Sequence, residues 1–344
     1  MVMDGSVLLI NEKEATSLLG MKDTIKLMEN CFHEFGSGRV INPIKLHLSL
    51  RPEVQGYINS MPSYMVDSNI MGCKMVGVFK NNGKEGLPAT LGVSVLFNPQ
   101  NGAPYTIMDA THITNIRTGA IAGVQAKYLT KKGSKIVTII GAGAQGLNSF
   151  EAVQTAIGTI EECRLVDINP AMVEKFTHKA QKLFPNVKYV PYTDIQTACT
   201  GSDIVVPCAT ATKPLLRGIK FDKGTTIIVV AEPLDDPKWV RSFDKTFCDF
   251  PACMIERMNQ DGRYYASLNG TTFTDLPEDM FEFLLGDVVC GKISGRDNDD
   301  QIILSATVGM SMYDNMCAEV IYQRARDKGM GVKLPFMDME WNED

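Results

Sequence analysis

The sequence lacks the cysteine and histidine patterns that mark metal and dithiol sites. Its nine cysteines are scattered without a CxxC pair, and its four histidines form no HxxxH or HExxH pattern. Metal ligands need such spacings because they must converge on one ion. We therefore expect no metal site. We interpret the cysteines as thiols in a reducing compartment, which predicts a cytoplasmic protein.

Long apolar runs and dense runs of positive charge are also missing. The longest apolar runs, such as 136–140 and 227–231, have strand length and fall far short of the ~20 residues that span a bilayer. The N-terminus has no basic segment followed by an apolar stretch. The net charge of -6 gives no attraction to phosphate backbones or anionic lipid. We expect neither a membrane nor a nucleic acid as a partner.

Two kinds of periodic pattern follow one another along the 344 residues, a length that favours two domains. Apolar residues between Ile25 and Phe35 recur at spacings of three and four, which predicts a helix. Short alternating runs from Pro43 to Gly102, separated by Gly, Asn and Pro, predict a mainly antiparallel sheet. Residues 114–129 return to helical spacing.

From Ser134 onward, strand-like and helix-like runs alternate, which is typical of βαβ units and a parallel sheet in an α/β fold. Helices are expected at 145–157, in a stretch that ends near Lys182, and from about 301 to 326. The expected strands are 135–140, 162–166, 187–190, 203–206 and 226–230.

A glycine-rich turn, Gly-Ala-Gly-Ala-Gln-Gly, stands between the first of these strands and its helix. Gly141 permits the tight turn, and Gly143 lets the backbone approach a pyrophosphate. Gly146 lets helix and strand pack closely, while the helix N-terminus faces the anion. The pattern predicts a Rossmann dinucleotide-binding unit.

Asp167 follows the second strand, 21 positions after Gly146. A carboxylate at this place accepts hydrogen bonds from the adenosine ribose and repels the extra phosphate of NADP, so NAD is the expected cofactor. NADP stays open as an alternative, because Asn169 and Lys175 could reorganise the pocket. The purely structural alternative is a glycine-rich turn with an acidic cap on the next helix.

Taken together with other segments, the chain resembles the ornithine cyclodeaminase and mu-crystallin family over nearly its whole length. The resemblance implies an α+β substrate-binding and dimerisation domain, residues 1–130 with 327–344, around an inserted Rossmann domain, 131–326. It also implies a homodimer. Besides the glycine turn, the matching segments are 43–45, 60–62, 72–74, 85–88, 109–114, 117–118, 308–309 and 313–314.

Within this resemblance, Lys74 and Arg117 are implied to face the substrate and the nicotinamide as catalytic and substrate-binding residues. An α-amino or α-imino acid needs its carboxylate fixed by cationic donors, and a guanidinium does so through two hydrogen bonds. A desolvated Lys74 could also exchange protons with the substrate nitrogen. The structural alternatives are a solvent-facing lysine and an ordinary first-turn arginine.

The resemblance also implies a set of cofactor contacts. Thr118 and Gln145 have alternatives as helix caps or packing residues, and Thr210 as an ordinary strand-end turn. The full set of expected cofactor-binding residues is Gly141, Gly143, Ala144, Gln145, Gly146, Asp167, Thr118 and Thr210.

The chain departs from the family pattern at three places. Lys45 stands where arginine is common. The compact ammonium of lysine then replaces a guanidinium that can make two parallel hydrogen bonds to a carboxylate. Asn59 stands where ornithine cyclodeaminase has the glutamate that holds the distal amine of its substrate, and a neutral amide binds a second ammonium poorly. Both residues are expected to bind substrate. The family's catalytic aspartate has no clear counterpart. Glu232, Asp235 and Asp236 are the alternatives, and a carboxylate in such a loop is more often simply solvated.

These expectations combine into a function. The resemblance implies an NAD(H)-dependent oxidoreductase that transfers hydride at the α-carbon of a small amino or imino acid, as an amino-acid dehydrogenase or imine reductase. The first alternative is ornithine cyclodeaminase, which converts ornithine to proline and ammonia. The second is a ligand-binding protein with low turnover.

Overall fold

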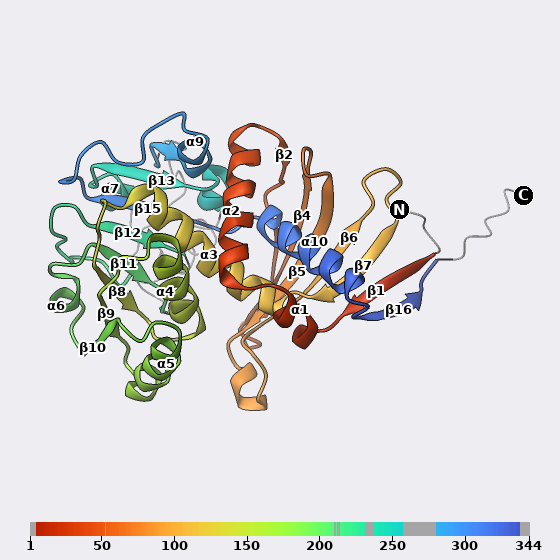
Figure 1. Cartoon of the computed structure of the whole chain (residues 1–344), viewed down its shortest axis with the longest axis horizontal. Helices are drawn as coiled ribbons and strands as arrows, with labels where there is room; N and C mark the ends of the chain where they lie inside the picture. Colours follow the sequence, from red (N-terminus) through yellow and green to blue (C-terminus); the bar gives the residue numbers. More distant parts are fainter. Residues whose placement is uncertain are drawn as a thin grey trace, which may run out of the picture. The chain divides into compact units, whose positions relative to one another are not determined.

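The computed structural model describes residues 5–51, 53–209, 211, 214–230, 237–256 and 280–337. The chain forms two compact units, each of which is continuous in space but not in sequence (Figure 1). The first unit contains Met1–Leu27, Gly38–Arg117 and Met310–Asp344, and the second contains Met28–Ser37 and Thr118–Gly309. The limits expected from sequence, 1–130 with 327–344 against 131–326, stay a prediction.

The first unit is built on an eight-stranded sheet in the order β16-β1-β7-β6-β5-β4-β2, with β3 paired to β4. All pairs are antiparallel except β1 with β7. The antiparallel sheet predicted for residues 43–102 is therefore present, and strands from the two ends of the chain extend it. The strands are β1 (Ser6–Ile10), β2 (Val40–Ile41), β3 (Leu46–Ser49), β4 (Gly56–Met65), β5 (Ile70–Phe79), β6 (Thr90–Phe97), β7 (Pro104–Asp109) and β16 (Val332–Pro335).

One face of this sheet is covered by helix α10 (Ser311–Asp327), which packs on β4, β5 and β6. Buried positions alternate along these strands, as expected for a sheet with one face in the core. The remaining helices are α1 (Glu12–Leu18) and the 3-10 helix η1 (Asn82–Glu85), together with α2 (Met21–Gly36) and α3 (Thr111–Leu129), whose residues are divided between the two units.

The second unit contains an eight-stranded sheet in the order β10-β9-β8-β11-β12-β15-β13-β14. Every pairing in it is parallel. The strands are β8 (Ile136–Ile140), β9 (Glu162–Val166), β10 (Lys188–Tyr192), β11 (Ile204–Pro207), β12 (Thr226–Val229), β13 (Lys245–Cys248), β14 (Phe283–Leu284) and β15 (Ile303–Ala306). The strand order reverses between β8 and β11, which is the Rossmann arrangement. The α/β fold predicted from the alternating runs is confirmed.

Both faces of this parallel sheet are buried. Ile139, Val206 and Ile228 belong to an apolar cluster on one face with residues of α3, α4 (Ala144–Ile157) and α5 (Pro170–Leu183). Ile140, Val205 and Ile227, their neighbours in sequence, belong to a second cluster on the other face. Shorter helices complete the unit: α6 (Ile195–Cys199), α7 (Pro237–Val240) and α9 (Leu285–Val289).

The prediction of a helix from about residue 301 to 326 is wrong for its first part. Residues Ile303–Ala306 form strand β15, fully buried between β12 and β13, and the helix begins only at Ser311. A short apolar run that is buried on both faces has no alternation, so periodicity cannot separate it from a buried helical segment.

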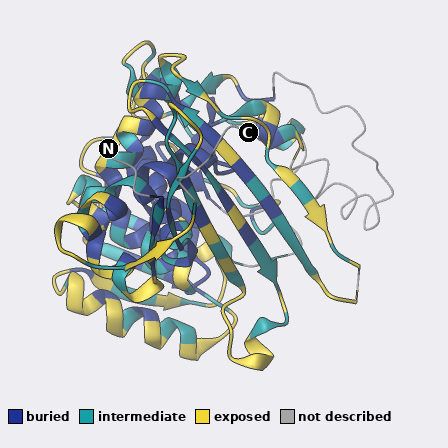
Figure 2. Cartoon of the chain, turned by 90° about the vertical axis from the view of Figure 1, so that its right-hand side faces the viewer, coloured by how far each residue is buried: buried dark blue, intermediate teal, exposed yellow. Residues whose placement is uncertain are grey.

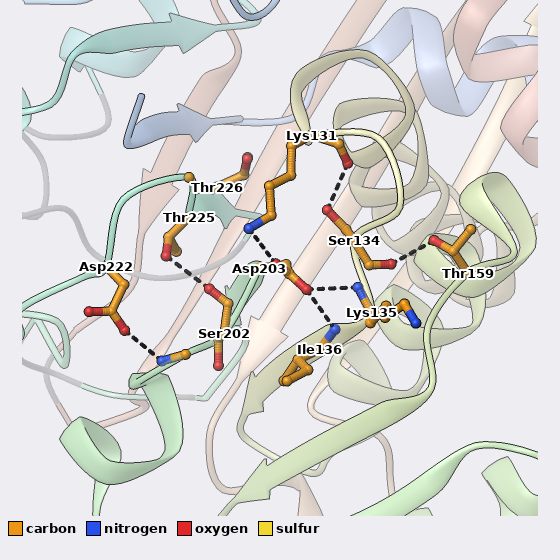
Figure 3. Close-up of polar contacts among 12 residues, drawn as sticks. Lys131, Ser134, Lys135, Ile136, Thr159, Ser202, Asp203, Asp222, Thr225 and Thr226 are labelled. Carbon is orange, nitrogen blue, oxygen red and sulfur yellow. Dashed lines mark hydrogen bonds and ion pairs between the residues drawn. The ribbon is translucent and has the colours of Figure 1, made fainter. Parts of the chain in front are cut away.

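The amino ends of the parallel strands are joined by a polar network (Figure 3). Oδ2 of Asp203 accepts hydrogen bonds from the backbone N–H groups of Lys135 and Ile136 at 2.7 and 2.9 Å, and Oδ1 lies 2.7 Å from Lys131 Nζ. The side chain of Asp203 thereby ties the loop before β8 to the loop before β11. Ligands of open parallel sheets bind at the opposite, carboxyl edge, so we interpret this network as structural.

Candidate functional site

The glycine turn lies at the carboxyl end of β8, at the point where the strand order reverses. Gly141 has a φ of +101°, and a Cβ atom on it would lie 2.6 Å from the backbone nitrogen of Ala209, just after β11. Only glycine avoids both the left-handed strain and the collision. The turn is therefore pressed against the end of β11 at the switch point, where dinucleotides bind in this fold.

Gly143 leaves open space in front of helix α4. It is the N-cap of α4, makes no side-chain cap, and a Cβ atom on it would have no neighbour within 4 Å. Ala144, Gln145 and Gly146 form the first turn behind it. A helix N-terminus with open space beside Gly143, as far as the described residues show, fits the pyrophosphate of a dinucleotide.

Asp167 is brought to this turn by β9, which it follows directly. Its Oδ2 accepts the N–H of Ala142 at 2.7 Å and its Oδ1 accepts the N–H of Asn169 at 2.8 Å. The Asn169 side chain caps α5 by accepting the N–H of Ala171 at 3.1 Å, and Lys175 is exposed on that helix. The Asn169 amide is thus engaged in the cap, and the ribose role of Asp167 stays a prediction.

Of the remaining expected cofactor residues, the structure describes Thr118 but not Thr210. Thr118 is 8% exposed in α3, and the next residue, Gly119, packs so closely on Asn148 of α4 that a Cβ atom would lie 2.6 Å from the Asn148 carbonyl carbon. Thr118 therefore lies near the α4 helix that carries Gln145. Thr210 lies outside the described residues, as do Glu232, Asp235 and Asp236.

In the first unit, Lys74 and Arg117 meet on one buried carboxylate. Lys74 Nζ lies 2.7 Å and Arg117 Nε 3.0 Å from Oδ1 of Asp314. Lys74 Nζ also donates to Thr114 Oγ1 at 3.3 Å. Strand β5 supplies Lys74, α3 supplies Thr114 and Arg117, and α10 supplies Asp314. The side chains of Lys74 and Asp314 are 1% and 0% exposed, so the solvent-facing interpretation of Lys74 is wrong.

Helix α10 is held in place so that Asp314 reaches this position. Ser311 Oγ donates to the carbonyl of Met61, and Asn315 Nδ2 donates to Ser63 Oγ at 2.8 Å. Both contacts fasten the first turn of α10 to β4. A Cβ atom on Gly72 of β5 would lie 2.8 Å from Asn315 Oδ1, so glycine there permits the close approach of helix and sheet.

The surroundings of Lys74 lower its pKa from 10.5 to about 8. Burial is the main cause, because it disfavours the charged ammonium, and the charges of Arg117 and Lys45 act in the same direction. Asp314 opposes them through its charge and its hydrogen bond. A lysine with this pKa can hold a carboxylate as a cation and can also exchange a proton close to neutral pH.

Only one of the two carboxylate oxygens of Asp314 contacts the cations. Its Oδ1 contacts both cations, whereas its buried Oδ2 has no hydrogen-bond partner among the residues that the structure describes. Two cations share a single anion in this cluster, so it carries net positive charge when Lys74 is protonated. Such a cluster can bind an anionic group of a ligand.

Two further expected substrate residues belong to the same unit. Asn59 of β4 is 9% exposed, and its Oδ1 lies 2.8 Å from Nδ1 of His47 on β3. Lys45, half-buried just before β3, contributes its charge to the lowered pKa of Lys74. The structure thus groups Lys45, Asn59, Lys74 and Arg117 in one unit, and their roles toward a substrate stay predictions.

Sequence reasoning assigned no role to Asp314 or Thr114, although segments 313–314 and 109–114 were part of the family resemblance. A signal for Asp314 was present: an acidic residue among Met312, Tyr313 and Met316 on an apolar helix face requires a buried partner. The identity of that partner depends on tertiary packing. Among the described residues, no group of three or more His, Cys, Asp or Glu side chains could hold a metal ion. No helix in those same residues is long and apolar enough to cross a membrane.

Comparisons with known proteins agree on one family. Residues 7–329 match the ornithine cyclodeaminase/mu-crystallin family. The chain is 30% identical to a Delta(1)-pyrroline-2-carboxylate reductase of Bacillus cereus, over 96% of this chain and 100% of that protein. It is 25% identical to an alanine dehydrogenase of Archaeoglobus fulgidus, over 96% of this chain and 98% of that protein.

A solved structure extends the likeness to three dimensions. The Delta(1)-pyrroline-2-carboxylate reductase of Thermococcus litoralis, in complex with NADH and L-proline, superposes with a TM-score of 0.81 at 30% identity, covering 95% of this chain and 99% of that one. The chain therefore belongs to the ornithine cyclodeaminase/mu-crystallin family.

Proposed function

We propose that this protein is an NAD(H)-dependent oxidoreductase that transfers a hydride at the α-carbon of a small amino or imino acid. The observation that carries the proposal is the buried cluster in which Lys74 and Arg117 share the carboxylate of Asp314. Its net positive charge suits the α-carboxylate that every such substrate has. The glycine turn after β8 supplies the second requirement, a place for a dinucleotide.

The protein's own groups have distinct roles in this reaction. Arg117 and Lys74 bind the α-carboxylate and so orient the α-carbon. When the imine is reduced, its carbon gains a hydride and its nitrogen gains a proton, which the Lys74 ammonium can give because its pKa is lowered to about 8. In the oxidative direction, neutral Lys74 takes the proton back. Bound NAD(H) supplies or accepts the hydride.

The residues that would hold NAD(H) lie at the carboxyl edge of the parallel sheet. The backbone from Gly143 to Gly146 would bind the pyrophosphate, and Asp167 would bind the ribose hydroxyls. Thr118 and Gln145 are proposed as further contacts. Asp167 also disfavours the additional phosphate of NADP by charge repulsion, which supports NAD as the cofactor.

The presence of asparagine at position 59 favours general imine reduction or amino-acid dehydrogenation over ornithine cyclodeamination. A neutral amide that already gives its oxygen to His47 offers no negative charge to a distal ammonium. The relatives that carry reductase and dehydrogenase names, at 30% and 25% identity, support the same ranking.

We further propose a cytoplasmic homodimer that forms through the face of the first unit's sheet opposite α10. The cross-strand row of Leu46, Ser60, Met75 and Val93 lies on that face, and Leu46, Met75 and Val93 are 71%, 49% and 38% exposed. Figure 2 shows exposed segments interspersed with buried ones along the strands. An exposed apolar sheet face of this kind is typical of a protein interface. Light scattering of the purified protein, with Met75→Lys as a disruptive variant, tests it.

Absorbance at 340 nm tests the catalytic proposal. We expect NADH oxidation with a cyclic imine such as Delta(1)-pyrroline-2-carboxylate, or NAD+ reduction with an amino acid. Release of proline from ornithine without a net absorbance change would instead establish cyclodeamination. Tight binding of an apolar ligand with no turnover of any amine or imine would establish a binding protein.

A further inference from the structure

Helix α3 presents a threonine hydroxyl to the ammonium of Lys74. Lys74 Nζ donates to Thr114 Oγ1 at 3.3 Å, and Thr114 Oγ1 itself donates to the carbonyl of Ala110 at 2.7 Å. A hydroxyl carries one hydrogen and two lone pairs. Because that hydrogen is used on Ala110, Thr114 meets Lys74 as an acceptor and offers it no proton.

The position of Thr114 is fixed by contacts between α3 and the sheet. Ala110, just before α3, donates its N–H to the carbonyl of Gly92 on β6 at 2.9 Å, and β6 is the strand next to β5. The Asp109 carboxylate accepts the N–H of Thr111 at 2.9 Å and so caps the first turn of α3. The bond from Thr114 to the carbonyl four residues earlier limits the rotation of its side chain. The hydroxyl oxygen is therefore held in one place.

A carboxylate is the second acceptor on the ammonium. Asp314 Oδ1 lies 2.7 Å from Lys74 Nζ. An ammonium has three N–H bonds, and in the part of the chain that the structure describes its hydrogen-bond partners are Thr114 and Asp314. One of the three N–H bonds is thus left for a ligand.

The second acceptor has to be a neutral group, because of the charges around this ammonium. Charged groups from three segments act on it: Asp314 of α10, Arg117 of α3 and Lys45 before β3. Arginine and lysine have donors only. Cys317 of α10 belongs to the same cluster, and burial raises the pKa of its thiol, so that it stays neutral. The Thr114 hydroxyl adds an acceptor without adding a charge.

The two acceptors also determine where the lone pair lies when Lys74 loses its proton. A neutral amine keeps two N–H bonds, and each of the two acceptors can hold one. A lone pair directed at the oxygen of Asp314 or Thr114 would be repelled by it and would leave that buried acceptor unpaired. The lone pair therefore takes the third direction, which the third N–H bond occupied before.

We propose that Thr114 is a positioning residue, which together with Asp314 directs the transferable proton of Lys74 at the nitrogen of the bound imine. This role rests on the proposed function. In the reductive step the imine carbon gains the hydride that NADH supplies, and the electron pair of the C=N π bond moves to nitrogen and takes the proton from Lys74. Lys74 is left as a neutral amine, which water protonates again. Such a transfer depends on the alignment of donor and acceptor.

Removal of the hydroxyl tests this role through the pH dependence of imine reduction. Thr114→Val keeps the size of the side chain and removes the acceptor. An imine that is already protonated in acidic solution needs no proton from Lys74, whereas the neutral imine at higher pH does. We therefore expect the loss in kcat/KM for reduction of a cyclic imino acid to grow about tenfold between about pH 6 and about pH 8. A purely structural defect would lower kcat/KM by one factor at every pH.

Three further variants separate orientation from folding. Thr114→Ser keeps a hydroxyl that can bond the same carbonyl, so it should restore the wild-type pH dependence. Thr114→Ala removes the hydroxyl with less bulk and gives the same test if valine disturbs folding, which NAD+ binding monitors. The matched control is Thr24→Val in α2, where Oγ1 donates in the same way to the Gly20 carbonyl at 2.9 Å. Thr24→Val should keep the wild-type pH dependence.

The outcomes separate the role of Thr114 from the proposed function. A loss that grows with pH in Thr114→Val, is reversed in Thr114→Ser and is absent in Thr24→Val supports both. Imine reduction in which Thr114→Val loses nothing, or loses the same factor at every pH, overturns the role of Thr114 alone. Wild-type protein that reduces no imine at any pH contradicts the proposed function, and the role of Thr114 falls with it.

Discussion

Two lysine–aspartate pairs of the same length have opposite surroundings in this protein. Lys74 Nζ lies 2.7 Å from Asp314 Oδ1 in the first unit, and Lys131 Nζ lies 2.7 Å from Asp203 Oδ1 in the second. The side chains of the first pair are 1% and 0% exposed, and those of the second are 30% and 14% exposed. Distance alone would rank the two pairs as equal.

The two aspartates differ in how many of their carboxylate oxygens have hydrogen-bond partners. Asp203 accepts two backbone N–H groups besides Lys131, and although burial raises its pKa, the hydrogen bonds from Lys131 and these backbone groups together lower it (Figure 3). Asp314 has a buried oxygen without a partner among the described residues, and it faces two cations. A satisfied pair stabilises a loop junction, whereas an unbalanced buried cluster has charge available for a ligand.

The largest expected effect separates the two lysines by activity. We expect Lys74→Met to lower kcat/KM for imine reduction by about 10²–10⁴-fold, because a proton donor and a carboxylate ligand are both lost. Lys131→Met removes the same charge from a pair of the same length and should leave kcat/KM close to wild type. Steady-state kinetics of the two variants, with NAD+ binding as a check of folding, measures the difference. Equal losses in both variants would mean that Lys74 has no special role.

The second effect separates the two aspartates by stability. Asp314→Asn leaves two buried cations without an anion, and we expect a loss of about 3–5 kcal/mol in the free energy of unfolding. Asp203→Asn keeps an acceptor oxygen for the backbone N–H groups, so a smaller loss of about 1–3 kcal/mol is expected. Urea unfolding of both variants gives the comparison, and a larger loss for Asp203→Asn would contradict it.

The third effect is a pH dependence. Because the pKa of Lys74 is lowered to about 8, its ammonium is lost as the pH rises through that value. We expect kcat/KM for reduction of a cyclic imine to fall up to about tenfold per pH unit above it. Asp314 raises the pKa of Lys74, so Asp314→Asn should move the fall to lower pH, whereas Asp203→Asn should not. An unshifted profile in Asp314→Asn would exclude Lys74 as the titrating group.

The smallest effect concerns a third aspartate, Asp167, whose carboxylate accepts the N–H groups of Ala142 and Asn169. Replacing it with alanine removes the repulsion of a ribose phosphate, and we expect the preference for NADH over NADPH to fall by about tenfold. Asp203→Asn, in the same sheet, should keep the wild-type preference. Fluorescence titration gives the Kd values for both cofactors, and an unchanged ratio of the two values in Asp167→Ala would contradict the prediction.

What the sequence could predict was local. The strands from β8 to β12 and the turn at Gly141–Gly146 could be predicted because each depends on a signal within a few neighbouring residues. That signal is an apolar run for each strand and closely spaced glycines for the turn. Strand β15 was missed because a strand buried on both faces carries no periodic signature. The two units were expected, but the place of α10 with β4, β5 and β6 depends on contacts between residues far apart in the chain.

The candidate site shows the same limit. Lys74 and Arg117 could be named from the sequence segments around them. Neither segment indicates that both side chains contact Asp314, which follows Lys74 by 240 positions and Arg117 by 197. Likewise, Asn59 was recognised as a departure from the family pattern, whereas its orientation by His47 follows from the register of β3 on β4. Charge balance and amide orientation are properties of the folded protein.

Transfer of an isotopic label tests the central claim most directly. The enzyme is incubated with NADH that carries deuterium at the transferable C4 position and with an imino acid, and the amino acid product is analysed by mass spectrometry and NMR. We predict one deuterium at the α-carbon of the product, and far less labelled product in the same time when Lys74→Met replaces the wild type. NADH oxidation that leaves the α-carbon unlabelled would contradict the proposed hydride transfer.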